Sequence, residues 1–124
     1  MVDAPVRRVR VIAIVDDDES VRLSIKFLLE TADYVVRSYE QPARFLDAEW
    51  RDLDCLVVDQ HMPVHTGLEV LARLRGRGTL LPVVLITGSV SVELERRAAE
   101  FGAIVLVKPL VDADLLGVLA RVMG

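Results

Sequence analysis

The sequence predicts an α/β protein in which a five-stranded parallel sheet is covered by helices on both faces. Short runs of Val, Leu and Ile alternate along the chain with segments whose apolar residues recur at helical spacing. Two of these runs, 11–15 and 56–58, end in aspartate. Apolar residues make up 52% of the chain and aromatic residues only 5%, as expected for buried strands built from aliphatic residues.

Each predicted element has its own local signals. Asp17 or Asp18 caps the first helix, Pro42 stands in the first turn of the second, and Gly102 ends the fourth. The second strand alternates polar and apolar residues, which is typical of a sheet edge. In chain order, the predicted elements are strand 10–15, helix 19–31, strand 34–39, helix 42–49, strand 53–58, a helix opened by Thr66-Gly67 and ending near Gly76 and Gly78, strand 83–87, helix 90–101, strand 103–107 and helix 112–122.

This (βα)5 alternation predicts a single doubly wound domain over residues 1–124, with a short leader at 1–9. Five strands fit the order 2-1-3-4-5 better than the six-stranded order of dinucleotide-binding folds. The turn after the first strand is acidic and lacks the glycine patterns that cradle phosphate, so it would repel phosphate without a metal ion.

Composition excludes several classes of function. The net charge of −4 argues against nucleic-acid binding by this chain itself. The sequence has no recognisable signal peptide and no apolar run long enough to cross a membrane, so we expect a cytoplasmic protein without membrane contact. Cys55 lies in an apolar stretch, and we expect a buried, reduced thiol there.

Polar residues gather where the predicted strands end. Asp16-Asp17-Asp18 and Asp59 follow two of the apolar runs, and Thr87 and Lys108 end or follow two more. Because parallel strands present their carboxyl ends on one edge, these side chains should lie close together. Several carboxylates repel one another unless they share a cation or a proton, which favours a hard divalent metal with oxygen ligands.

With these motifs in order, the chain resembles the response regulator receiver domain of two-component signalling, a flavodoxin-like fold. The resemblance covers about residues 9–122 and is closest to the receivers of FixJ-type transcription regulators. The motifs that carry it are Ile14 to Arg22, Asp59-Gln60-His61-Met62-Pro63 with Gly67, Ile86-Thr87-Gly88 and Lys108-Pro109.

The resemblance implies that Asp59 accepts a phosphoryl group from the phosphohistidine of a histidine kinase. It also implies Mg²⁺ as cofactor, held by Asp16, Asp17, Asp59 and the backbone carbonyl of His61. Asp17 is the better placed direct ligand, and Asp16 is expected to bind through water. Asp18 is the alternative ligand in this register, but its position suits a helix cap better.

The remaining site residues are implied in the same way. Lys108 would pair with Asp59 at rest and with the phosphoryl group afterwards, aimed by a cis bond to Pro109. The Thr87 hydroxyl would move to the phosphoryl group. The side chain of His61 is expected to have no catalytic or metal-binding role, although it could gate water, and His61→Ala would then change the rate of autodephosphorylation.

One position departs from the family pattern. Receivers usually carry Tyr or Phe three residues before the lysine, but this chain has Val105 there and no aromatic residue between 103 and 107. Coupling of Thr87 to the output surface is therefore expected to be weaker, or to run through shifts of helix 90–101.

The predicted function is a phosphorylation switch rather than an enzyme, with a sensor histidine kinase or phosphotransfer protein as partner. A phosphorylation-dependent homodimer is also expected. The expected output surface combines helix 90–101, the fifth strand and helix 112–122, with the exposed charges Glu93, Arg96, Arg97, Glu100, Asp112 and Arg121.

Two other classes compete with this prediction. A Mg²⁺-dependent phosphohydrolase or phosphotransferase would also place aspartate at a strand end, but it usually needs a cap domain and a second aspartate two residues after Asp59. A degenerate docking module would lack part of the motif set. We expect a stand-alone receiver slightly more than a receiver cut from a longer DNA-binding regulator.

Overall fold

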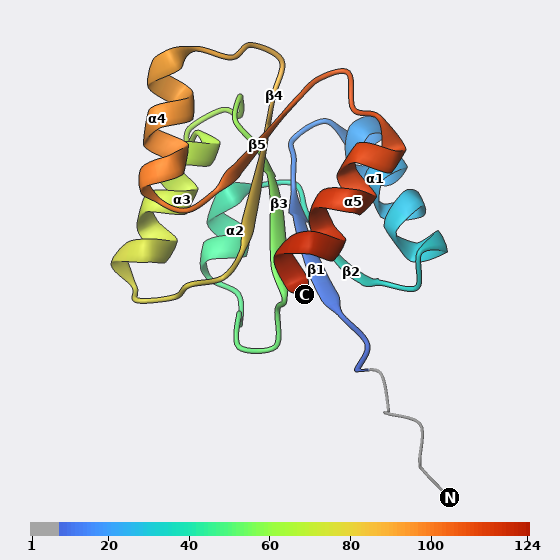
Figure 1. Cartoon of the computed structure of the whole chain (residues 1–124). Coiled ribbons are helices and arrows are strands. Elements are labelled where there is room, and N and C mark those ends of the chain that lie inside the picture. The colour runs from blue at the N-terminus through green and yellow to red at the C-terminus, as the bar shows by residue number, and fades with distance from the viewer. Residues whose placement is uncertain (1–7) are drawn as a thin grey trace, which may run out of the picture.

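The computed structural model describes residues 8–124 and alternates strands with helices throughout (Figure 1). The leader predicted for residues 1–9 falls mainly outside this described part. The elements are β1 (Val11–Val15), α1 (Glu19–Thr31), β2 (Val35–Tyr39), α2 (Pro42–Leu46), β3 (Cys55–Asp59), α3 (Gly67–Gly76), β4 (Val83–Thr87), α4 (Val92–Glu100), β5 (Ile104–Val107) and α5 (Asp112–Met123).

The five strands form one parallel sheet in the order β2-β1-β3-β4-β5, which confirms the predicted fold. The central strands β3 and β4 are buried along their whole length, whereas β2 is partly exposed at the edge. Val15 pairs with Val58, and Asp59 pairs with Ile86, so the carboxyl ends of β1, β3 and β4 lie side by side.

Alternate residues of the strands feed two hydrophobic clusters, one on each face of the sheet. On one face α2, α3 and α4 cover the sheet, and on the other face α1 and α5 do so (Figure 1). Cys55 is completely buried in the second cluster, and burial raises the pKa of its thiol to about 12, as expected for an inert cysteine. Within the described residues, no helix is both long and apolar enough to cross a bilayer.

Side-chain caps set the beginnings of α1, α3 and α4. The Asp18 carboxylate accepts a hydrogen bond from the backbone N–H of Val21 at 3.2 Å, so Asp18 is the cap of α1, as predicted. Thr66 and Glu69 form a reciprocal capping box at the start of α3.

Two predicted boundaries between β2 and α3 were wrong. Helix α2 ends at Leu46 instead of 49, because the chain folds back and the Trp50 indole donates to the Phe45 carbonyl at 2.7 Å. Strand β3 begins at Cys55 instead of 53. Asp54 lies just before it and accepts a hydrogen bond from the backbone N–H of Val11 at 2.8 Å.

The predicted start of α4 also needed correction. The helix predicted over 90–101 begins at Val92, and Val90 precedes it and is 37% exposed. The Ser91 hydroxyl accepts from the Leu94 N–H at 3.0 Å, and this cap fixes the helix start. In α5 the buried face consists of Leu115, Val118 and Leu119.

Candidate functional site

Three polar side chains are buried among residues 8–124, and all three stand at the same edge of the sheet. Asp16 follows β1 and is 2% exposed, Asp59 ends β3 and is 4% exposed, and Thr87 ends β4 with no exposure. Buried carboxylates are unfavourable unless charge or hydrogen bonding compensates them. Their burial at one edge therefore indicates a site and not a feature of the apolar core.

The acidic residues predicted as metal ligands lie together. Asp16, Asp17 and Asp59 each offer a carboxylate oxygen, and these three oxygens lie within 4.8 Å of one another. Burial raises the pKa of Asp16 above its ordinary value, and the negative charges of Asp59 and Asp17 raise it further. The backbone N–H of Asp18, at 2.9 Å from Asp16 Oδ1, opposes this shift, as does the Lys108 charge.

A positive charge lies directly beside Asp59. The Lys108 ammonium stands 3.1 Å from Asp59 Oδ1 and is about one-third exposed. This contact is an ion pair, and Asp59 Oδ1 has no hydrogen-bond partner among the described residues. The backbone supports the lysine: its N–H donates to the Thr87 carbonyl at 2.8 Å, and the bond to Pro109 is cis, as the resemblance implied.

The donor set fits a hard metal ion. Three carboxylates face one ammonium, and a buried carboxylate oxygen lacks a hydrogen bond within the described part of the chain. Oxygen ligands of this kind suit hard divalent cations, whose charge would offset the repulsion between the carboxylates. The cluster could therefore bind a metal ion.

Two local features hold the acidic loops in place. The guanidinium of Arg22, on α1, donates to the Asp16 backbone carbonyl at 2.9 Å. On the other side, α3 starts so close to β3 that a Cβ added at Gly67 would lie 2.7 Å from the Asp59 carbonyl oxygen. Only glycine allows this approach, which fixes the position of Asp59 at the strand end.

The structure also shows a contact that sequence reasoning missed. The side chain of His61, in the loop after β3, places Nε2 at 3.4 Å from the Thr87 hydroxyl oxygen. No pattern in the sequence signals this contact, because it depends on the direction in which an irregular loop aims the ring.

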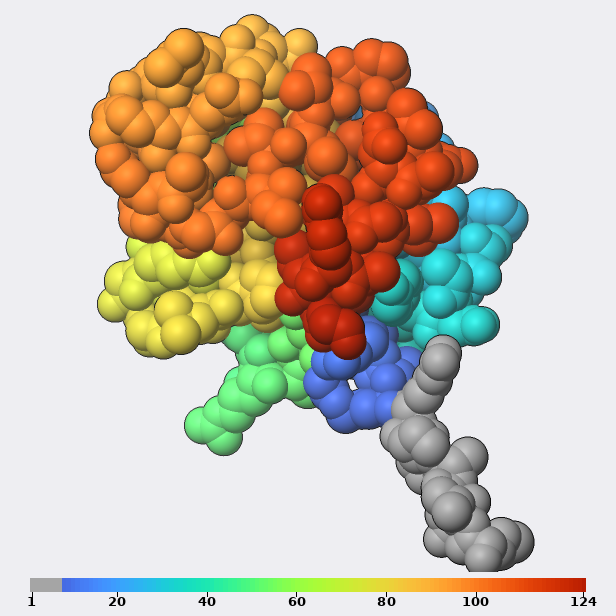
Figure 2. Space-filling view, viewed as in Figure 1, coloured from blue at the N-terminus to red at the C-terminus, as the bar shows by residue number. Residues whose placement is uncertain are grey.

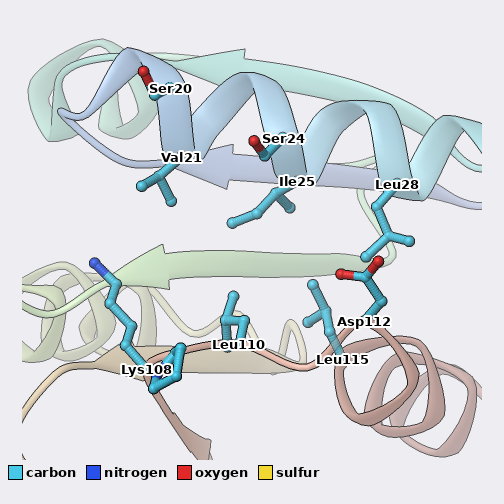
Figure 3. Close-up of a pocket in the computed structure, with 10 residues that line it drawn as sticks. Ser20, Val21, Ser24, Ile25, Leu28, Lys108, Leu110, Asp112 and Leu115 are labelled. Carbon is cyan, nitrogen blue, oxygen red and sulfur yellow. The ribbon is translucent and has the colours of Figure 1, made fainter.

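A groove of about 340 Å³ opens beside Lys108, between α1 and the segment that leads from β5 into α5. Figure 3 shows Val21, Ile25 and Leu28 of α1 on one side, facing Leu110 and Leu115 across the groove. Its walls are mainly apolar, and Lys108 stands at one end (Figure 3).

A doubly wound sheet of this strand order, with carboxylates, a hydroxyl and an ammonium at one edge, is the arrangement that the resemblance to receiver domains implied. The family model described as "Response regulator receiver domain" matches residues 12–120, and the chain belongs to this family.

Relatives and solved structures agree with this assignment. The chain is 38% identical over 113 residues to the transcriptional regulatory protein FixJ of Azorhizobium caulinodans, covering 90% of this chain and 54% of that protein. FixJ of Bradyrhizobium diazoefficiens is 35% identical over 106 residues, with coverages of 84% and 52%. The chemotaxis protein CheY4 of Vibrio cholerae is 29% identical, with a TM-score of 0.83 over 93% of this chain and 99% of that chain.

These findings define the class of function. The chain is a receiver domain of a response regulator, a signalling domain and not an enzyme, and the phosphohydrolase alternative has no support. Response regulators interact with histidine kinases or phosphotransfer proteins. The chain spans about half the length of the two FixJ proteins that it matches.

Proposed function

We propose that Asp59 is the phosphoacceptor of this receiver and that Asp16, Asp17 and Asp59, with the backbone carbonyl of His61, hold Mg²⁺. The observation that carries this proposal is the cluster itself: three carboxylate oxygens within 4.8 Å of one another, with an ammonium 3.1 Å from Asp59. When bound, Mg²⁺ would neutralise charge on the transferring phosphoryl group.

The Asp59 carboxylate is suited to nucleophilic attack on a phosphohistidine. One carboxylate oxygen forms a bond to phosphorus while the bond from phosphorus to the imidazole nitrogen breaks, and the leaving imidazole keeps that electron pair and takes up a proton. Asp59 Oδ1 makes no hydrogen bond among the described residues, and the Lys108 ammonium 3.1 Å away is its charged neighbour.

Lys108 and Thr87 have separate roles in this proposal. At rest the ammonium balances the Asp59 charge, and after transfer it pairs with a phosphoryl oxygen. The Thr87 hydroxyl, at the end of the adjacent strand, turns from its resting partners to donate to another phosphoryl oxygen. Both movements change the end of the sheet that leads towards β5 and α5.

The groove beside Lys108 is the proposed binding site of the phosphoryl donor protein. A donor segment lying along α1 would bury the apolar groove wall and bring its phosphohistidine to the end where Lys108 contacts Asp59. Phe27, three residues after Ser24 on α1, is 72% exposed and would add apolar surface for a partner that lies along this helix.

The proposed output surface combines α4, β5 and α5, which lie on one face of the molecule (Figure 2). All six charged residues expected there are exposed, and Arg96 forms ion pairs with Glu93 and Glu100 along α4. Val92 and Val107 are also exposed and would be covered in a phosphorylation-dependent homodimer. A single domain over residues 1–124, a cytoplasmic location and the lack of nucleic-acid binding by this chain stay predictions.

The test is incubation with acetyl phosphate or phosphoramidate and Mg²⁺, followed by intact-protein mass spectrometry. We expect one added phosphoryl group on the wild type and none when EDTA removes the metal. The Asp59→Asn variant should stay unlabelled, whereas Asp54→Asn, at an aspartate just before the same strand, should label normally. Equal labelling of Asp59→Asn and the wild type would contradict the proposal.

A further inference from the structure

The Thr87 hydroxyl is fully engaged in the resting structure. It donates to the Ser89 carbonyl at 2.8 Å and accepts from the Ser89 backbone N–H at 3.1 Å. The third neighbour is His61 Nε2 at 3.4 Å. A hydroxyl has one proton and two acceptor positions, so these three contacts use its whole capacity.

The direction of the third bond follows from the other two. Because the hydroxyl proton is given to the Ser89 carbonyl, it is not available to the imidazole. Nε2 must therefore carry the proton and donate to Thr87 Oγ1. This bond joins the loop after β3 to the end of β4, two segments that both border Asp59.

The neighbouring strand β5 carries no aromatic residue that could take this role. Strand β5, where receivers usually carry an aromatic residue, has the partly buried Val105, which packs into the hydrophobic cluster on the α2–α4 face. The aromatic ring that contacts Thr87 comes instead from the loop after β3.

We propose that His61 is a positioning residue that holds the Thr87 hydroxyl in its resting orientation, away from the phosphoryl group. The inference rests on the proposed function, in which Thr87 turns to the phosphoryl group on Asp59. That turn breaks the hydrogen bond from His61, so the imidazole opposes the active state. The switch in this chain is thus restrained from the loop after β3.

The restraint is a modest one. A distance of 3.4 Å is long for a hydrogen bond to a hydroxyl oxygen, which places its contribution towards the low end of the usual range. Removing the bond should raise the affinity for a phosphoryl analogue roughly 2- to 3-fold.

Beryllofluoride, which mimics a phosphoryl group on a carboxylate, is the probe for the test. Its dissociation constant is measured calorimetrically at saturating Mg²⁺ for the wild type, His61→Phe and His61→Gln. Phe keeps a planar ring without an N–H, and Gln restores an N–H donor. We expect tighter binding by His61→Phe and near wild-type binding by His61→Gln.

Two controls separate this role from a general effect on the site. His65→Phe changes the other histidine of the same loop, whose Nδ1 faces Glu69, and should leave the affinity unchanged. In a Thr87→Val background, His61→Phe should have no effect, because the acceptor of the hydrogen bond is gone.

The outcomes distinguish the inference from the proposed function. If the wild-type protein binds beryllofluoride, the proposed phosphoacceptor site is supported. If His61→Phe then binds it no more tightly than the wild type, the inference about His61 is overturned. An effect of His61→Phe that persists without the Thr87 hydroxyl also overturns it. Failure of the wild type to bind beryllofluoride, although it binds Mg²⁺, overturns the proposed function and the inference together.

Discussion

Asp16 combines burial, neighbouring charge and metal binding in one side chain. Burial raises the pKa of its carboxyl group, so the folded protein holds this proton more tightly than the unfolded chain does. Proton linkage gives the sign of the effect on stability. As the pH rises from about 3.8, the pKa of Asp16 in the unfolded chain, through its higher pKa in the folded protein, the free energy of unfolding of the metal-free protein falls.

We therefore predict that Asp16→Asn raises the free energy of unfolding of the metal-free protein, relative to the wild type, more at pH 7.5 than at pH 4. Urea unfolding in EDTA should show a smaller fall in stability with rising pH for the variant than for the wild type. With Mg²⁺ at about 100 times its dissociation constant, the wild type should gain about 2.7 kcal/mol. The variant should gain much less, and an equal gain would exclude Asp16 from the metal site.

Val64 is a second residue with an unusual environment. It is 89% exposed in the loop between β3 and α3 and has a positive φ of 71°, a conformation that β-branched residues rarely adopt. Its side chain contributes almost no buried contact, so the backbone conformation dominates the effect of a substitution at this position.

We predict that Val64→Gly raises the free energy of unfolding by about 1 kcal/mol, because glycine adopts positive φ without steric cost. Asp33, with φ of 67°, provides the matched comparison. Asp33→Gly should raise the free energy of unfolding by less, because aspartate tolerates a positive φ better than valine does. Urea denaturation measures both changes, and a destabilised Val64→Gly protein would be inconsistent with strain at this position.

At the scale of elements, sequence patterns located the helices and strands well where capping or periodicity was local. The predicted helix 19–31 and strand 83–87 coincide with α1 and β4. The errors between β2 and α3 arose where a specific contact decides the boundary, while the start of α4 was misplaced although the Ser91 cap is local. The Trp50 contact that ends α2 and the Val11 contact that engages Asp54 join residues that local periodicity does not relate.

The packing of α3 against the end of β3 gives a pair of opposite predictions. An alanine Cβ at Gly67 would collide with Leu85 Cδ1 and would lie 2.7 Å from the Asp59 carbonyl oxygen. Gly67→Ala should therefore cost about 1–3 kcal/mol and slow phosphorylation of Asp59, because the backbone must shift.

Gly76, at the other end of the same helix, is the control. A Cβ there meets nothing within 4 Å, so Gly76→Ala should stabilise the protein by about 0.5–1 kcal/mol through better helix propensity. Thermal unfolding and the rate of acetyl phosphate labelling report both effects. Equal tolerance of the two alanines would show that the close approach at Gly67 does not position Asp59.

At the scale of the whole molecule, the strand order explains why the site was largely predictable. Parallel strands in the order β2-β1-β3-β4-β5 bring residues 16, 59 and 87 to one edge, although they are far apart in the sequence. The proximity of Asp16, Asp17, Asp59 and Lys108 was thus expected from topology, while the chemical roles of these residues stay predictions. The His61 contact with Thr87 follows from loop geometry, which topology does not determine.

The central claim is that one carboxylate, Asp59, receives the phosphoryl group within the acidic cluster. Borohydride reduction of the phosphorylated protein converts an aspartyl phosphate to homoserine, which peptide mass spectrometry locates. We expect homoserine at position 59 alone, and only when Mg²⁺ was present during labelling. Homoserine at position 16 or 17, or at no position despite a labelled protein, would contradict it.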